Sequence, residues 1–287
     1  MSDLEQFVAF AHLLADAAGR IITPYFESEL SVEDKADKTP VTRADREAEA
    51  AMRGLIEQTY PDHAIYGEEF GQSVGGTVRS AEAARAAKRQ GSAEGEGGAS
   101  LPSNNKLMWV LDPIDGTRAF IAGRREWGTL IALCDDGVPI LGLLNQPVTG
   151  ERWLGVRGER TLYQGQPTFT RICDGLKQAE FSTTSASYFT PEQAARVVAL
   201  AQQSGPAVRD GDCYAYGLLA RGARDIVLDA GLKPYDILAL VPIIEGAGGT
   251  ITGWDGAPIT LSHFATALAA GDARLHQETL AILGATA

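Results

Sequence analysis

The segment W-V-L-D-P-I-D-G-T, which begins at Trp109, constrains what this chain can fold into more than any other part of its sequence. An apolar run leads directly into Asp112, and Asp115 follows three residues later. Pro113 fixes one backbone dihedral between the two acids, and Gly116 permits a tight turn and close approach by a ligand. The segment therefore predicts a buried strand that ends in a rigid turn bearing two carboxylates.

Two carboxylates on one rigid turn suit an oxygen-seeking divalent cation, and a helix that starts near Thr117 would suit a phosphate. The alternative is a turn in which the Asp side chains bond to their own backbone. The acids of G-E-E at 67–69 and Asp236, before an apolar helix, favour the metal site. The four histidines show no ligand spacing such as H-E-x-x-H, so an all-oxygen, magnesium-type site is expected and a zinc site is not.

Composition limits the classes of partner. The chain has 287 residues, 45% of them hydrophobic, which is enough to bury a core, and it carries 37 Asp+Glu against 25 Lys+Arg, a net charge of −12. Such an excess of acid disfavours nucleic acid and anionic membranes as partners. The three cysteines show no C-x-x-C spacing, the N-terminus lacks a basic leader, and no apolar run is long enough to span a membrane. We therefore expect reduced thiols and a cytoplasmic protein.

Hydrophobic patterning predicts layered α and β structure in both halves. The first half should hold a helix over about 4–25, an exposed loop at 33–42, and a helix that Thr42 caps and that ends near 58. An antiparallel meander should follow, with strands at 106–111, 128–134, 138–145 and 152–156. The second half alternates helices and short strands, with helices starting at Thr190, Asp236 and Ala273.

Residues 72–106 contain almost no large apolar side chains. Such a composition cannot repay the entropy of ordering a packed segment, so we expect a mobile surface insertion there. The alternative is an ordered lid over the site, since long loops often carry function.

The motifs together resemble the inositol monophosphatase family. The resemblance rests on K-A-D-K-T-P-V-T-R-A-D at 35–45, G-E-E at 67–69, W-V-L-D-P-I-D-G-T at 109–117, and Y-D at 235–236 before a helix that ends in E-G-A-G-G. It spans nearly the whole chain except 72–106. It implies an αβαβα, fructose-bisphosphatase-like fold of the α+β class, with an antiparallel sheet in the first half and a mixed sheet in the second. It also implies a phosphomonoesterase that uses two or three Mg²⁺ ions, and a homodimer.

The resemblance also implies where the site residues lie. The first half, 1–178, would carry most metal ligands, and the second half, 179–287, would carry Asp236 and the substrate contacts. One Mg²⁺ would be held by Glu68, Asp112 and the Ile114 carbonyl, and a second by Asp112, Asp115 and Asp236.

The remaining roles concern water and phosphate. By the same resemblance, Thr117, paired with Asp45, and Glu68 would orient and deprotonate an attacking water, and the Gly116 and Thr117 amides would hold phosphate oxygens. Lys35 is either a residue that acts near the site or a solvated loop lysine.

The substrate class follows from less general residues. The run R-D-G-D-C-Y-A-Y-G-L-L-A, from Arg209, and the runs W-G-T-L-I-A-L and L-K-P-Y-D-I-L-A-L-V-P-I-I-E-G-A-G-G resemble the histidinol-phosphate phosphatase branch. Arg209, Asp212 and Asp229 are the expected substrate contacts. A carboxylate, that of Asp212 or Asp229, suits the ammonium group of histidinol phosphate. The alternative role for Asp212 is a helix N-cap.

Three hypotheses for function therefore stand. The first is a histidinol-phosphate phosphatase acting in histidine biosynthesis. The second is an inositol-1-phosphate or sugar-phosphate monophosphatase of the same family. The third is a non-catalytic sensor of phosphate or metal that has kept the fold. Because most of the motif acids would converge on one cleft, substrate binding is expected to depend on metal.

Overall fold

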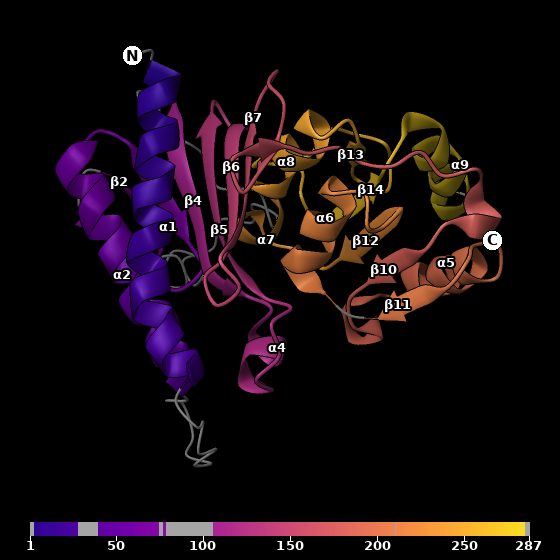
Figure 1. The fold of residues 1–287 in the computed structure, drawn as a ribbon, viewed down its shortest axis with the longest axis horizontal. Helices are drawn as coiled ribbons and strands as arrows, with labels where there is room; N and C mark the ends of the chain where they lie inside the picture. Colours follow the sequence, from indigo (N-terminus) through magenta and orange to yellow (C-terminus); the bar gives the residue numbers. More distant parts are fainter. Residues whose placement is uncertain (1–2, 28–39, 75–76, 79–105, 210, 285–287) are drawn as a thin grey trace, which may run out of the picture.

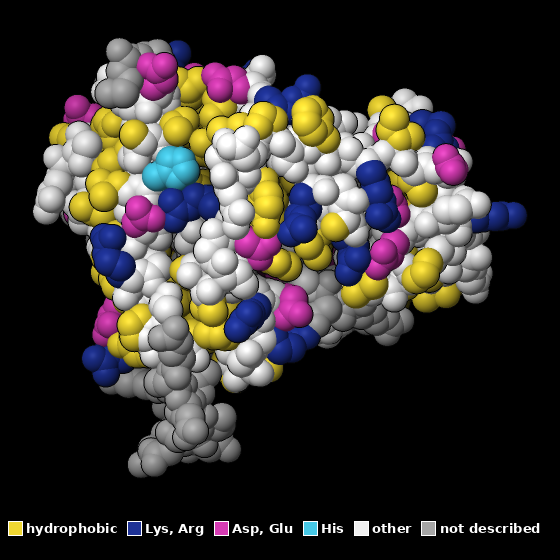
Figure 2. Space-filling view, viewed as in Figure 1, with side chains coloured by type: hydrophobic (Ala, Val, Ile, Leu, Met, Phe, Trp, Pro, Cys, Tyr) yellow, Lys and Arg dark blue, Asp and Glu magenta, His cyan; other side chains and the backbone are white. Residues whose placement is uncertain are grey.

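The computed structural model describes residues 3–27, 40–74, 77–78, 106–209 and 211–284. Its described strands form two sheets that lie side by side, with helices between them and on both outer faces (Figure 1). From the N-terminal helices to the C-terminal ones the layers follow the order αβαβα, as expected. On the face seen in Figure 2, acidic and basic side chains are interspersed among apolar and other residues.

The first sheet has nine strands in the order β3-β2-β1-β4-β5-β6-β7-β8-β9. Their bounds are β1 Ala64–Gly67, β2 Gly71–Val74, β3 Thr77–Val78, β4 Leu107–Asp115, β5 Gly128–Asp135, β6 Val138–Gln146, β7 Glu151–Val156, β8 Leu162–Tyr163 and β9 Gln166–Pro167. The predicted meander is β4 to β7, paired antiparallel throughout. One pair departs from the expected antiparallel pattern: β1 runs parallel to β4. Parallel neighbours require a crossover connection and cannot be joined by a tight hairpin.

Both faces of this sheet are buried. Alternate residues of β4 and β5 point to opposite sides, so Val110 and Ala132 join a core with the central helices while Trp109 and Ile131 join a core with the outer helices. The outer helices are α1 (Asp3–Glu27) and α2 (Pro40–Thr59), which pack on each other. Burial on both faces explains why these strands read as continuous apolar runs.

The second sheet is mixed, as expected, with the order β11-β10-β12-β14-β13. Its strands are β10 Phe181–Thr183, β11 Ala207–Arg209, β12 Ile226–Ala230, β13 Thr250–Thr252 and β14 Thr266–Ala270. The helices α6 (Asp212–Ala220), α7 (Pro234–Ile237) and α8 (Leu240–Gly246) contribute to the core between the sheets. The helices α5 (Pro191–Ala201) and α9 (Ala273–Gly284) cover the outer face. The proposed division at residue 178 falls between the strands of the two sheets.

The remaining described elements are short. They are α4 (Thr117–Ile121) and the 3-10 turns η1 (Leu176–Gln178) and η2 (Ala186–Tyr188). Cys134, Cys173 and Cys213 are all buried and free of disulfides, in agreement with the expected reduced thiols. Within the described residues, no helix combines the length and apolar character needed to cross a membrane.

Three expectations about local structure need correction. The start of the expected insertion at 72–106 is sheet, because β2 and β3 extend the edge beside β1; the rest of it, 79–105, lies outside the described residues, as does Lys35. Helix α2 begins at Pro40, where proline is favoured in a first turn, so Thr42 lies inside the helix and is not its cap. The expected helix from Asp236 is two helices, with Asp236 inside α7.

Candidate active site

A β-bulge brings the two acids of the D-P-I-D turn together. In the pairing of β4 with β5, Asp112 lies opposite Leu130 and Asp115 opposite Gly128, so three steps along β4 match two along β5. Residues three apart in a regular strand point to opposite faces, and the extra residue of a bulge cancels that alternation. The carboxylates of Asp112 and Asp115 therefore meet in one cluster.

The turn that follows is held by its own hydrogen bonds. The Asp112 Oδ1 atom accepts from the Ile114 N–H at 3.1 Å, and the Thr117 hydroxyl donates to the Ile114 carbonyl oxygen at 3.2 Å. Gly116 has φ of 91°, and a Cβ at this position would come within 2.9 Å of the Glu126 carbonyl oxygen. The turn thus requires glycine before α4 begins at Thr117, as the sequence predicted.

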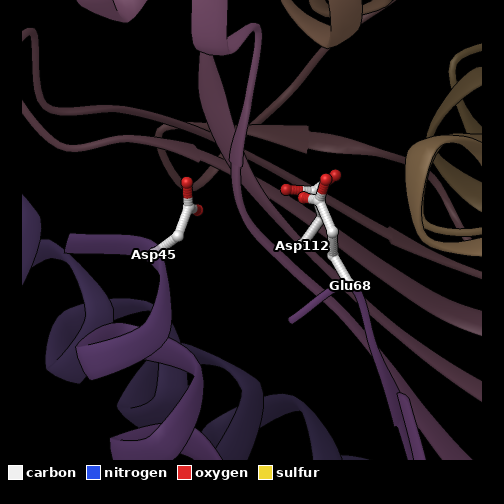
Figure 3. Close-up of side chains that lie close together, drawn as sticks. All are labelled: Asp45, Glu68 and Asp112. Carbon is white, nitrogen blue, oxygen red and sulfur yellow. The ribbon is translucent and has the colours of Figure 1, made fainter. Parts of the chain in front are cut away.

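Two groups of carboxylates lie at the end of the β1–β4 pair. Asp45, Glu68 and Asp112 offer oxygen atoms within 4.8 Å of one another, and so do Asp112, Asp115 and Asp236. Figure 3 shows the Glu68 and Asp112 carboxylates side by side, with Asp45 pointing up from α2 across from them. The parallel pairing explains this meeting, because Gly67 lies opposite Leu111 and each strand delivers its next residue at the same edge.

Both clusters have the donor set of an oxygen-ligated divalent cation. The Oδ1 atom of Asp45 is buried and has no hydrogen-bond partner among the described residues. A buried acceptor without a donor is costly, and a bound cation or its water would satisfy it. The residues therefore fit a metal site, and the structure adds Asp45 to the group around Glu68 and Asp112.

Crowding shifts the acids toward their protonated forms. Burial, helped by the carboxylates of Glu68 and Glu69, raises the pKa of Asp45 to about 9. Burial also raises the pKa of Asp112 and Asp115 well above the usual range, and it raises the pKa of Asp236 to about 7. Desolvation within the cleft and the neighbouring Glu69 carboxylate raise the pKa of Glu68. A cation held between these groups would reverse the shifts by supplying positive charge.

The expected pairing of Thr117 with Asp45 is absent among the described hydrogen bonds. The Thr117 hydroxyl donates to Ile114 at the end of β4, while the Asp45 Oδ1 atom is left without a partner. A hydroxyl that donates in one direction can still accept in another, so both groups remain able to contact a water.

The second half of the chain forms the opposite wall of a cleft of about 660 Å³. The predicted residues Asp212, Asp229 and Asp236 all line it, together with Arg118 and Arg124. Asp236 is held by the Lys233 N–H, which donates to its Oδ2 atom at 2.7 Å. The side chain of Arg209, predicted to contact substrate, lies outside the described part of the chain.

Asp212 is not the cap of α6. It is the first residue of the helix, with φ of 38°, while Gly211 occupies the cap position. Burial raises the pKa of Asp212, and the positive charges of Arg118 and Arg124 oppose that rise. The alternative role of Asp212 as an N-cap is therefore wrong, and its carboxylate lines the cleft.

Asp229 is buried and held by two donors. The Thr184 N–H donates to its Oδ1 atom and the Tyr216 hydroxyl to its Oδ2 atom, both at 2.9 Å. Burial nevertheless raises the pKa of Asp229 to about 7. Neither partner was identified from the sequence. One signal in the sequence could have pointed to Tyr216. It lies one helical turn after Cys213, a spacing that places both residues on one side of α6.

Comparisons with known proteins agree with this geometry. A family model described as "Inositol monophosphatase family" matches residues 3–285. The bifunctional phosphatase IMPL2, chloroplastic, of Arabidopsis thaliana is 43% identical over 97% of this chain and 75% of its own length. The histidinol-phosphatase of Streptomyces coelicolor is 32% identical over 99% of this chain and 98% of its own. A solved inositol monophosphatase from Zymomonas mobilis has a TM-score of 0.84 at 40% identity, covering 99% of this chain and 100% of that one.

Proposed function

Because the chain belongs to the inositol monophosphatase family and is thus a phosphoric monoester hydrolase, we propose that it hydrolyses L-histidinol phosphate to L-histidinol and phosphate with Mg²⁺. The observation that carries the choice of substrate is the pair of carboxylates, Asp212 and Asp229, in the wall that faces the metal-ligand clusters. The name of the Streptomyces coelicolor relative, histidinol-phosphatase, supports the same choice.

The metal ions would be held by the two carboxylate clusters. Glu68, Asp112 and the Ile114 carbonyl would ligate one ion, with Asp45 beside them, and Asp112, Asp115 and Asp236 would ligate another. When bound, magnesium lowers the pKa of water and neutralises charge on the phosphoryl oxygens and the leaving alkoxide. A shared ligand, Asp112, would tie the two positions together.

The protein's own groups would orient the attacking water and take its proton. Either the Thr117 hydroxyl oxygen or the unpartnered Oδ1 atom of Asp45 would accept one hydrogen bond from that water. A Glu68 carboxylate oxygen would receive the other proton of that water. The Gly116 and Thr117 amides, at the start of α4, would donate to the phosphate oxygens. Direct attack by water requires no covalent phosphoenzyme.

The alcohol part of the ester would meet the opposite wall. An ammonium group would pair with Asp212 or Asp229, whereas a neutral polyol would offer these two carboxylates no opposite charge. Arg209, at the end of β11, is kept as a further proposed substrate contact.

The second candidate is an inositol-1-phosphate or sugar-phosphate monophosphatase. It is favoured by the Zymomonas mobilis structure, which carries the name inositol monophosphatase and matches this chain at 40% identity. The sensor hypothesis has less support, because all four side chains proposed as metal ligands are present and clustered.

The deciding experiment measures phosphate release by the purified protein from L-histidinol phosphate and from inositol 1-phosphate, with Mg²⁺ and after chelation. We expect a higher kcat/KM for L-histidinol phosphate and no turnover without metal. A strong preference for inositol 1-phosphate would contradict the first proposal and support the second. Absence of metal-dependent turnover on any phosphomonoester would leave the sensor.

Two further properties belong to this proposal. Three unpaired, buried thiols favour a reducing compartment, so we place the enzyme in the cytoplasm. We also propose the homodimer that the family resemblance implies; sedimentation of the purified protein tests it.

A further inference from the structure

Glu49 is a fully buried carboxylate that lies outside the cleft. It sits on α2 one helical turn after Asp45, and its side chain is 0% exposed. Its Oε2 atom accepts from the Glu69 N–H at 2.7 Å, and its Oε1 atom accepts from the Phe70 N–H at 3.3 Å. These two N–H groups belong to the two residues after Glu68. The Glu49 carboxylate is therefore hydrogen-bonded to the backbone of the turn that carries Glu68.

Arg53, one more turn along α2, balances the charge of Glu49 and extends the contact. Its Nε atom donates to the Glu49 Oε1 atom at 2.7 Å, and its side chain is 7% exposed. The remaining guanidinium nitrogens donate to the Ser73 hydroxyl, at 2.8 Å, and to the Gly71 carbonyl oxygen. The Glu49–Arg53 pair is therefore hydrogen-bonded both to the turn after β1 and to the strand β2 that follows the turn.

Gly67 shows how closely α2 approaches this turn. A Cβ at residue 67 would lie 2.0 Å from the Glu49 Oε1 atom and 2.3 Å from its carboxyl carbon. Contacts this short do not occur between non-bonded atoms, so the Glu49 carboxylate occupies the space that a side chain at residue 67 would need. The glycine of G-E-E is thus explained by a residue on another element.

We infer that Glu49 is a positioning residue that sets the place of Glu68 relative to Asp45. Asp45 and Glu49 are four residues apart, so they lie on the same face of α2. That face therefore carries both an acid of the cluster, Asp45, and the carboxylate that holds the backbone next to Glu68. Groups that orient metal ligands through hydrogen bonds commonly tune metal affinity. The inference rests on the proposal that Glu68 is a metal ligand.

Metal binding to the chelated, metal-free protein tests this without using turnover. Titration with Mn²⁺, followed by the loss of the free-ion EPR signal, gives the affinity directly. We expect Glu49→Gln to bind Mn²⁺ about 10- to 100-fold more weakly, the range found for residues that orient metal ligands. Binding as tight as in the wild type would overturn the inference.

Asp225→Asn is the matched control for loss of a buried charge. Asp225 is also a buried carboxylate, 0% exposed, that accepts from an arginine, Arg171, and from a backbone N–H, that of Glu180. It does not line the cleft. We expect its Mn²⁺ affinity to remain that of the wild type even where its melting temperature falls. An equal loss of affinity in both variants would overturn the positioning role, because general destabilisation would then explain it.

A second variant approaches the contact from the other side and leaves Glu49 intact. Gly67→Ala places a methyl group against the Glu49 carboxylate and should weaken Mn²⁺ binding, whereas Gly54→Ala, on α2 with nothing within 4 Å of its Cβ position, should not. Should Glu49→Gln fail to fold, this comparison decides, and equal affinities of the two alanine variants would overturn the inference. If the wild type itself binds no Mn²⁺, the proposed metal site is wrong. If the wild type binds Mn²⁺ and Glu49→Gln binds it equally well, only the positioning role of Glu49 is wrong.

Discussion

The backbone N–H of Cys213 donates to the Asp115 carboxylate, with 2.6 Å between the nitrogen and the Oδ2 atom. Asp115 belongs to the first sheet, and Cys213 lies in the first turn of α6, in the second half of the chain. A proposed metal ligand is therefore oriented by backbone from the opposite wall of the cleft. Because Asp236 also comes from the second half, the cluster of Asp112, Asp115 and Asp236 exists only when both halves are docked.

Asp112→Asn is expected to abolish activity. Asp112 is 1% exposed and is the one residue common to both carboxylate clusters, so its loss removes a ligand from each. We expect kcat/KM to fall by more than about 100-fold, which exceeds the usual effect of residues that only orient ligands. Phosphate release and Mn²⁺ titration measure the two effects. Asp62→Asn, at an exposed carboxylate, is the control, and retained turnover in Asp112→Asn would contradict the assignment.

Metal-free protein is expected to lose stability as pH rises from about 7 to about 9. In the folded chain the pKa of Asp236 is about 7 and that of Asp45 about 9, against an ordinary value of 3.8 for an aspartate. In this window the folded protein retains a proton that the unfolded chain has released, so raising pH favours unfolding. The histidines that carry lowered pKa values titrate below this window and do not oppose the trend.

Melting temperatures of chelated protein at pH 7 and pH 8.5 measure this slope. Asp45→Asn should flatten it, because the variant has no proton to lose at that position. Added Mg²⁺ should raise the melting temperature more at pH 8.5, since binding displaces protons from its ligands. A melting temperature of metal-free protein that rises over this interval would contradict the buried, protonated state of Asp45.

Asp212→Asn is expected to weaken hydrolysis of L-histidinol phosphate selectively. Asparagine tolerates the φ of 38° at this position, so the substitution removes charge with little change in backbone. A lost charge-assisted hydrogen bond corresponds to about 1.5–3 kcal/mol, or roughly 10- to 100-fold in kcat/KM. Inositol 1-phosphate, which carries no ammonium group, serves as the comparison substrate. Equal effects on the two esters would show that Asp212 does not recognise the cation.

Tyr216→Phe is expected to raise the pKa of Asp229 above about 7. The Tyr216 hydroxyl donates to Asp229 and stabilises its charged form, so its removal favours the protonated acid. If Asp229 binds the ammonium group as an anion, the KM for L-histidinol phosphate should rise at pH 7 and recover at higher pH. The control is Tyr163→Phe, whose hydroxyl donates to Glu151 away from the cleft. An unchanged pH profile would remove Asp229 from substrate recognition.

Local sequence was sufficient where the chemistry is local. The turn from Asp112 to Thr117 could be predicted because proline, glycine and two acids restrict the same few bonds. The meander could be predicted because its apolar runs are separated by short turn signals. Asp45 was assigned to the site only through the family resemblance, since its neighbourhood in the fold is created by tertiary packing.

The contacts that were missed join elements distant in sequence. Nothing near Gly67 indicates that the Glu49 carboxylate fills its side-chain space, and nothing near Asp115 indicates that the Cys213 amide binds it. The strands β2 and β3 were missed because their residues are mostly small and polar. They belong to the sheet because β2 pairs with β1 and β3 pairs with β2, and not because they bury an apolar face.

The parallel pairing of β1 with β4 has a consequence for engineering. The register that sets Gly67 against Leu111, and hence Glu68 beside Asp112, is fixed by hydrogen bonds between the strands themselves. A single residue added between Ala64 and Gly67 would therefore shift Glu68 away from Asp112.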